Sequence, residues 1–248
     1  MKTTKKALSL LLILALALAA FAGCAKSAQP ATQTPATDTP AEAPAAEAPA
    51  KSGGSFTVGV IQFGSHPSLD NCYEGVRQAL EASGNVTIDL QNGNFDSATC
   101  DTIAKNMVAK NYDMLIGIAT PAAVSAYAAA ANTDIPVVFC AVSDPVAAGL
   151  VDSMEAPGGN CTGTSDVLDF AAQLGLITTL QPEAKSIGIL YTTSEANSVS
   201  QLNQIKAIAP QFGMEIVEQG VQTAADIPQA AAALAAKVDC INNFTDNN

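Results

Sequence analysis

The sequence predicts an α/β fold built on parallel sheets, because short apolar runs alternate with longer stretches typical of helices. Residues 114–119 and 136–142 are almost entirely apolar, as expected for strands buried on both faces of a parallel sheet. Each run is followed by a hydroxyl or carboxylate residue and a proline, in Thr120-Pro121 and Ser143-Asp144-Pro145, which is typical of a helix start. We therefore expect helix N-termini at the carboxyl edge of the sheet, where ligands bind in open α/β folds.

The elements divide into two series that predict two lobes. The predicted strands are residues 56–63, 86–90, 114–119, 136–142, 161–165, 186–191, 214–221 and 238–244. The predicted helices are residues 70–82, 98–110, 122–131, a short helix that ends at residues 149–154, 169–180, 199–212 and 227–237. Asp70 is the predicted cap of the first helix, and Asp96 or Ser97 is that of the second. The first five strands predict lobe 1 at residues 55–166, and residues 167–248 predict a second lobe. No helix is left to cover the last strand, so we expect the second lobe to be incomplete and the chain to be a fragment or a truncated product.

The N-terminal residues predict export and a lipid anchor. Residues 1–23 have a basic start and an apolar run that is short for a membrane span, which is the form of a signal peptide. Phe21-Ala22-Gly23-Cys24 resembles the lipobox of bacterial lipoproteins, with Phe21 in place of the usual leucine, and implies lipidation of Cys24; an ordinary secretory signal is the alternative. Residues 24–54 are rich in Ala and Pro and predict a disordered linker. We expect the protein on the extracytoplasmic face of the cell membrane.

Composition argues against several classes of function. A formal net charge of -12 argues against nucleic acid as a partner. His66 is the only histidine, so neither a His-based metal site nor a catalytic triad can be completed. The five cysteines after Cys24 form no CxxC motif and give no assignable disulfide. G-x-S-x-G, P-loop and G-x-G-x-x-G motifs are absent, and the sequence predicts no enzyme, cofactor or metal.

Six short motifs carry a resemblance to a known family. They are residues 59–63 with His66-Pro67 and Leu69-Asp70, then residues 118–123, 141–146, 157–160, 194–198 and 245–247. In this order they resemble the substrate-binding lipoproteins of ABC transporters, in the branch tied to tryptophan and tyrosine uptake. The resemblance implies a type I periplasmic-binding-protein fold with doubly wound parallel sheets, two lobes that close on a small-molecule ligand, and an ABC permease as partner. Asn242 and Asn243 depart from the apolar strand usual in the family.

The candidate ligand-binding residues all follow predicted strands. They are Gln62, Phe63, His66, Thr120, Pro121, Ser143, Asp144, Ser194, Glu195, Asn197, Ser198 and Asp246. A site for a dianion would normally contain Arg or Lys, and these turns contain neither. We therefore expect a zwitterion, with its carboxylate on Thr120, Ser143 and helix N-terminal N–H groups and its ammonium on Asp246 or Glu195. The resemblance implies that this zwitterion is an aromatic amino acid, whose ring would stack on Phe63. As alternatives, Thr120, Ser143 and Asp144 serve only as helix caps, His66 makes only a loop hydrogen bond, and Asp246 belongs to a frayed end.

A second function, in a different class, is compatible with the same features. A ligand-sensing lipoprotein would pass its bound state to a membrane kinase or chemoreceptor instead of a permease. The neighbouring genes distinguish the two, because a permease and an ATPase favour transport whereas a kinase favours sensing.

Overall fold

The computed structural model describes residues 55–247. The predicted signal peptide, Cys24 and the whole of the predicted linker lie outside these residues. Across the described part, no helix is both long and apolar enough to cross a membrane.

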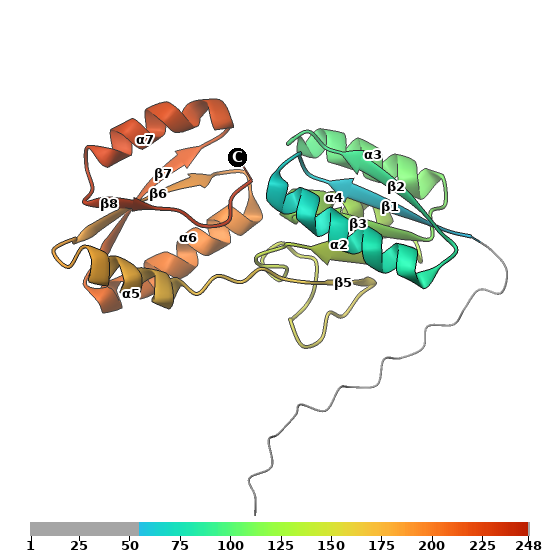
Figure 1. The fold of residues 1–248 in the computed structure, drawn as a ribbon, viewed down its shortest axis with the longest axis horizontal. Coiled ribbons are helices and arrows are strands. Elements are labelled where there is room, and N and C mark those ends of the chain that lie inside the picture. Colours follow the sequence, from blue (N-terminus) through green and yellow to red (C-terminus); the bar gives the residue numbers. More distant parts are fainter. Residues whose placement is uncertain (1–54, 248) are drawn as a thin grey trace, which may run out of the picture. The chain divides into compact units, whose positions relative to one another are not determined.

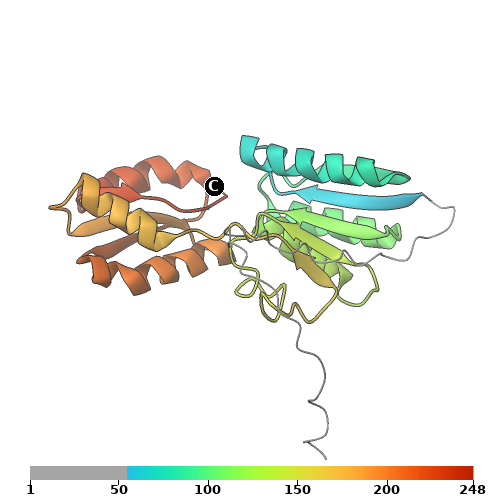
Figure 2. The same ribbon diagram turned by 60° about the horizontal axis from the view of Figure 1, so that its bottom comes forward.

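The first sheet is five-stranded and entirely parallel, in the order β2-β1-β3-β4-β5 (Figure 1). Its strands are β1 (Phe56–Gln62), β2 (Val86–Asn92), β3 (Met114–Ile118), β4 (Val137–Cys140) and β5 (Cys161–Gly163). Helix α2 (Pro67–Ser83) packs on one face, and α3 (Ser97–Ala109) and α4 (Thr120–Ala130) pack side by side on the other (Figure 2). The central strands are apolar because helices cover both faces: Ile61, Leu115 and Ile118 are each 0% exposed.

The second sheet has three parallel strands in the order β7-β6-β8. Its strands are β6 (Ser186–Thr192), β7 (Glu215–Val221) and β8 (Cys240–Asn242). Helix α7 (Ile227–Ala235) packs on one face and α6 (Ala196–Ile208) on the other, with α5 (Phe170–Leu180) beside α6 (Figures 1 and 2). Two short 3-10 helices, η1 (Ala209–Phe212) and η2 (Ala224–Asp226), also belong to this part of the chain. The β-α-β-α-β order of the first sheet is thus repeated in the second.

The cap residues correct one predicted helix start and decide between the two alternatives predicted for another. His66, not Asp70, caps α2: its Nδ1 accepts from the Ser68 N–H at 3.2 Å, and Pro67 follows at the first helical position. Asp70 lies one turn inside the helix, where its Oδ1 accepts from Gln62 Nε2 at 2.7 Å. Of the two predicted caps of α3, the structure has Asp96, whose Oδ1 accepts from the Thr99 N–H at 2.6 Å.

The prediction of Thr120 as a helix cap is wrong. The chain turns at Ala119, which has φ 75°, so that Thr120 is already the first residue of α4 and no side chain caps this helix. A positive φ at alanine costs about 1 kcal/mol or more, and such strain gathers at functional sites. Ala141, directly after β4, also has a positive φ, of 55°.

The predicted short helix ending at residues 149–154 does not form. Asp144 Oδ1 accepts from the Ala147 N–H at 2.9 Å and closes a local turn, and Gly149 adopts φ 72°, which a continuing helix does not allow. The last strand is also shorter than predicted, because Phe244 leaves the sheet and packs edge to face against Phe170 at 6.4 Å.

Candidate functional site

The strand order places a topological switch point in each sheet. Strands β1 and β3 are neighbours, and the connection that leaves β1 runs to β2 on one side whereas the connection that leaves β3 runs to β4 on the other, which opens a crevice between the carboxyl ends of β1 and β3. Phe63 and Thr120 flank this crevice, with the Phe63 N–H donating to the Ile118 carbonyl at 3.2 Å. The second sheet repeats the arrangement, since β6 lies between β7 and β8.

A cavity of about 670 Å³ lies at these strand ends and takes residues from both sheets. Its lining is Phe63, Phe95, Asp96, Ser97, Ala98, Asp101, Thr120, Pro121, Val124, Ser125, Ser194, Glu195, Ala196, Gln222 and Thr223. The N-termini of α3, α4 and α6 therefore face it. Neither α4 nor α6 has a side-chain cap, which leaves backbone N–H groups and positive dipole ends for an anionic ligand group.

The charges in the cavity lining are all negative. Asp96, Asp101 and Glu195 contribute carboxylates, and no Lys or Arg lines the cavity. Asp96 is occupied in capping α3, and Asp101 accepts from Ser125 Oγ at 2.6 Å. Positive potential for a ligand carboxylate therefore comes only from the helix N-termini, which suits a group with one negative charge better than a dianion.

An aromatic residue that the sequence analysis missed forms one wall. Phe95 is 43% exposed and lines the cavity, whereas the predicted stacking residue Phe63 is only 4% exposed and meets the Phe95 ring edge to face at 5.7 Å. Gly64 makes this position possible, since a Cβ on it would come within 2.3 Å of the Phe95 ring. Phe95 was detectable as an aromatic residue in the turn after the second predicted strand.

Five of the predicted residues line none of the described cavities, and four of them are buried: Gln62, Ser143, Asn197 and Ser198, with Asp144 as the fifth. Gln62 is 3% exposed, and its Nε2 donates to the Gly64 carbonyl and to Asp70, which fixes the start of α2. Asn197 is 1% exposed and donates to the Thr245 carbonyl at 3.2 Å. Ser198 is 0% exposed and donates to Asp246 Oδ2 at 2.6 Å. Their contacts hold the strand-end turns in place.

A smaller cavity of about 250 Å³ contains two further residues that were predicted to bind the ligand, His66 and Asp246. His66, Ser68, Leu69, Phe95, Thr245, Asp246 and Asn247 line it. Asp246 bridges the switch point of the second sheet, because its carboxylate accepts from the Thr192 N–H at 2.8 Å and from Thr192 Oγ1 at 2.6 Å. With Ser198 as a third donor, Asp246 is anchored to the turn after β6 instead of belonging to a frayed end.

Asp144 connects the turn after β4 to helix α6. Its Oδ2 accepts a short hydrogen bond from Ser200 Oγ and a further one from Gln204 Nε2 at 3.3 Å. Asp144 lines none of the described cavities. Its hydrogen bonds to Ser200 and Gln204 instead join the turn after β4 to α6.

Ser143 and a residue absent from the predicted set, Asp166, share a distinct environment. Ser143 is 8% exposed, and its Oγ is buried without a hydrogen-bond partner, as is Asp166 Oδ1. Burial raises the pKa of Asp166 above its usual value, although the Ser143 and Thr245 hydroxyls beside it act to lower that pKa. Asp166 follows the fifth predicted strand at the same sheet edge, which is the signal that could have singled it out.

Glu195 gives a prediction for the pH dependence of stability. Its side chain is 6% exposed, and burial raises its pKa, aided by the charge of Asp246 and opposed by hydrogen bonds from Asn247 and Asn197. A carboxyl whose pKa is higher in the folded than in the unfolded state contributes stability at low pH that is lost as the pH rises through the folded pKa. We expect Glu195→Gln to raise the unfolding temperature at pH 7 and to leave it unchanged below about pH 4, where both states are protonated.

The measurement is calorimetric unfolding of both proteins between pH 3 and pH 8. Glu215→Gln, at an exposed position, is the matched control and should show no such pH-dependent difference. A wild type that is more stable than Glu195→Gln at pH 7 would contradict the assignment of a costly buried charge.

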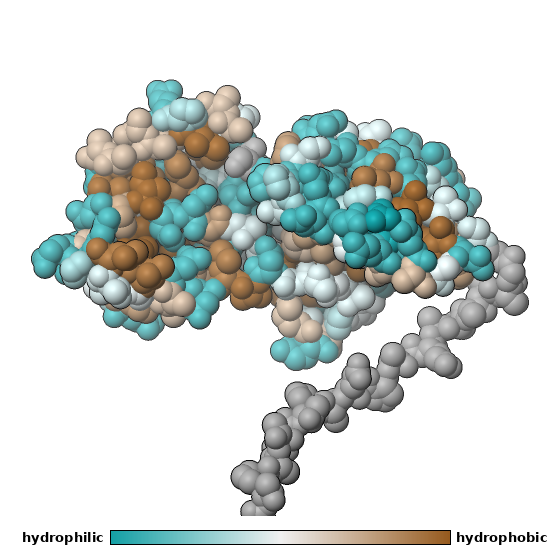
Figure 3. All heavy atoms as spheres, viewed as in Figure 1, coloured by the Kyte–Doolittle hydropathy of each residue, from teal (hydrophilic) through white to brown (hydrophobic). Residues whose placement is uncertain are grey.

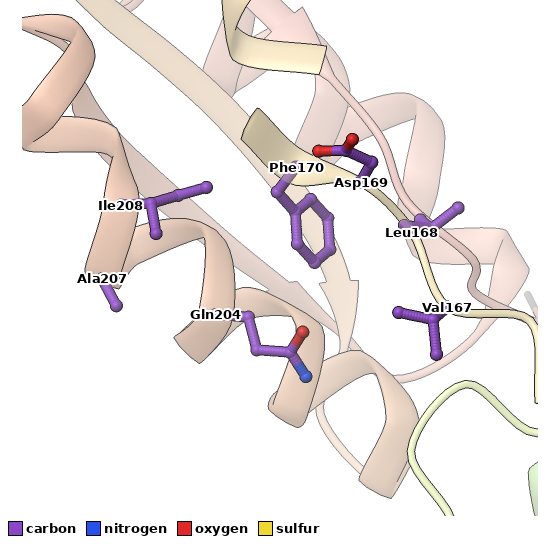
Figure 4. A pocket seen from close by; sticks show the side chains of 7 residues that line it. All are labelled: Val167, Leu168, Asp169, Phe170, Gln204, Ala207 and Ile208. Atoms are coloured by element: carbon purple, nitrogen blue, oxygen red, sulfur yellow. The ribbon is translucent and has the colours of Figure 1, made fainter. Parts of the chain in front are cut away.

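A third hollow lies away from the strand ends. Figure 4 shows Phe170 and Val167, from the segment entering α5, facing Gln204, Ala207 and Ile208 of α6. Leu176 and Leu180 are 58% and 71% exposed on α5, where Figure 3 shows apolar surface. This hollow is lined mainly by apolar groups and contains none of the predicted site residues.

The titratable residues of the described part suggest neither a metal centre nor a disulfide. Within residues 55–247, no group of three or more His, Cys, Asp or Glu side chains is placed to hold a metal ion. The cysteines of this part, Cys72, Cys100, Cys140, Cys161 and Cys240, are unpaired, and burial raises the pKa of Cys100 and of Cys161 to about 11.

The similarity to known proteins agrees with this geometry. A tyrosine-binding protein of Clostridioides difficile (strain R20291) is 43% identical over 195 residues, 77% of this chain and 56% of that protein. The crystal structure of an ABC domain from Streptococcus pneumonia in complex with L-Trp is 38% identical, with a TM-score of 0.74 over 78% of this chain and 66% of that chain. The ligand-free, open structure of a substrate binding protein with adhesive properties from Clostridium difficile is 39% identical, with a TM-score of 0.56 over 77% of this chain and 66% of that chain.

This chain thus spans a little over half of the curated relative and slightly less than two thirds of the two solved chains. The comparisons confirm the predicted fold, that of type I periplasmic binding proteins, and the relatives from Clostridioides difficile and Clostridium difficile are binding proteins by description. Residues 57–248 match the family described as ABC transporter substrate binding protein, and the chain belongs to that family.

Proposed function

We propose that this protein captures an aromatic amino acid outside the cytoplasm and delivers it to an ABC importer. The cavity at the strand ends carries the proposal, because it combines two uncapped helix N-termini, an exposed aromatic ring and no basic side chain. A zwitterion with an aromatic side chain matches all three features. The tyrosine-binding and tryptophan-bound relatives support the same class of ligand.

The proposed position of the ligand follows from the lining. The α-carboxylate would accept hydrogen bonds from the N-terminus of α4 and from the hydroxyl of Thr120, which is 3% exposed at the cavity wall. The ring would stack on Phe95, with Pro121 beside it. Ser194 and Glu195, at the start of α6, would contact the ligand from the opposite side.

The proposal includes the anchoring of the protein. Cys24 would carry the lipid, residues 24–54 would tether the binding part to the membrane, and residues 55–166 and 167–248 would act as the two lobes. An ABC permease would receive the ligand. The acidic composition and the absence of basic residues from the cavity lining give no support for a nucleic-acid partner.

Thermal unfolding with and without ligand tests the ligand class. At a ligand concentration of 100 times the dissociation constant, binding should add about 2.7 kcal/mol to the stability, and both L-tyrosine and L-tryptophan should raise the unfolding temperature. L-leucine and phosphate, each at the same concentration, are the controls and should have no effect. An equal shift with L-leucine, or no shift with either aromatic amino acid, would contradict the proposal.

A further inference from the structure

Asp166 lies where the chain leaves the first sheet, beside the end of β4. Ser165 Oγ donates to the Val142 carbonyl at 2.5 Å, which joins the residues after β5 to those after β4. The Asp166 carboxylate consequently neighbours the Ser143 hydroxyl, and the Thr245 hydroxyl reaches it from the segment after β8. Asp166 therefore touches the strand ends of both sheets.

Asp166 and Ser143 both retain unused hydrogen-bonding capacity in a buried place. Asp166 Oδ1 and Ser143 Oγ are buried and lack a hydrogen-bond partner, and the side chain of Ser143 is only 8% exposed. Within residues 55–247, no Lys or Arg forms an ion pair with Asp166. A buried carboxylate oxygen without a donor is costly, and a cationic donor is the group that best relieves that cost.

The other carboxylates near the strand ends are already engaged. Asp246 accepts from Thr192 and Ser198, and Glu195 accepts from Asn247 Nδ2 at 2.5 Å. Asp144 accepts from Ser200 and from the Ala147 N–H. The two residues expected from the sequence to hold a ligand ammonium, Asp246 and Glu195, thus have protein donors, whereas Asp166 Oδ1 has none.

We propose that Asp166, with the hydroxyl of Ser143, binds the α-ammonium group of the captured amino acid. This assignment rests on the proposed function and adds the residue that recognises the amino group. In an α-amino acid the ammonium and the carboxylate are bonded to the same carbon, so their sites must adjoin. The sheet meets this requirement, because β3 and β4 are neighbours with Ile118 paired to Cys140, which places Thr120 and Ser143 on adjacent strand ends.

A metal ion is a poorer occupant than an ammonium. Asp166 is one carboxylate with two hydroxyls beside it and the Cys72 thiol nearby, and the described residues contain no cluster of three metal-ligating side chains. Ca²⁺ and Mg²⁺ require six or more oxygen ligands, whereas a primary ammonium requires about three acceptors. The chemistry of the site therefore favours the organic cation.

The test compares L-tyrosine with 3-(4-hydroxyphenyl)propionate, which differs only in lacking the amino group. Isothermal titration calorimetry would measure both ligands with the wild type, Asp166→Asn and Ser143→Ala, and with Asp134→Asn as a matched control at an exposed position. We expect the wild type to prefer L-tyrosine by at least about a hundredfold. Asp166→Asn should bind L-tyrosine at least about tenfold more weakly and the propionate no more weakly, so that the preference collapses. Ser143→Ala should lose several-fold for L-tyrosine only.

Each other outcome overturns a specific statement. Equal weakening of both ligands in Asp166→Asn would show a structural role, and an unchanged preference would remove Asp166 from the site while leaving the proposed function intact. A wild type that binds neither L-tyrosine nor L-tryptophan would overturn the proposed function and this assignment together. Unfolding without ligand checks the fold of the variant: Asp166→Asn should unfold at the same temperature as the wild type or above it, because a partly buried carboxylate without an ion pair has been removed.

Discussion

Gly117→Ala is expected to destabilise the protein by about 3 kcal/mol, because it overpacks a site bounded by backbone. Gly117 lies in β3 between β1 and β4, and a Cβ on it would come within 2.4 Å of Ala123 Cα and 2.6 Å of Ala123 N. These atoms belong to the first turns of α4 and cannot rotate away, so the helix must move off the sheet. Since the N-terminus of α4 lines the cavity, the same variant should also bind L-tyrosine more weakly.

Urea unfolding and titration calorimetry measure the two effects. Gly75→Ala is the control, because Gly75 lies within α2 with no atom within 4 Å of an added Cβ. It should stabilise the protein by about 0.5–1 kcal/mol, since glycine in a helix interior is unfavourable relative to alanine. A Gly117→Ala protein with wild-type stability and affinity would show that α4 packs less tightly on β3 than the structure has it.

Phe95→Ala is expected to weaken the binding of L-tyrosine by about 2 kcal/mol, roughly thirtyfold, with little change in stability. The Phe95 ring is 43% exposed at the cavity, so the fold gains little from its burial, whereas a stacked ligand ring would cover it. Titration calorimetry gives the affinity, and thermal unfolding without ligand gives the stability.

Leu176→Ala is the matched control for the loss of an exposed apolar side chain. Leu176 is 58% exposed on α5 and lies outside the cavity, so its removal should leave the affinity unchanged. The stacking role of Phe95 would be contradicted if both variants lost affinity equally, or if neither lost any.

The position of the site could be predicted because it depends on a regular pattern. Apolar runs bounded by polar turns identify parallel strands, and polar residues that follow such strands gather at one edge of a sheet. Thr120, Pro121, Ser194 and Glu195 were placed on the cavity lining in this way. The local pattern failed at the helix starts, where Thr120-Pro121 and Asp144-Pro145 both suggested caps. Ala119 has a positive φ and donates its N–H to the Cys140 carbonyl of the neighbouring strand, which no local pattern reveals, and the turn at Asp144 closes without continuing into a helix.

The order of strands and helices, the two-lobed α/β class and the strand-end residues followed from the sequence, since hydrophobic periodicity and turn chemistry are local properties. Which of those residues are available to a ligand was decided only by the tertiary structure. Asp246 meets Thr192 across 54 residues of chain, and Asp144 meets Ser200 across 56, so their carboxylates are engaged by partners that no local pattern reveals. Burial and hydrogen bonding are set by such long-range neighbours, and they are what separate the anchored Asp246 from the unpartnered oxygen of Asp166.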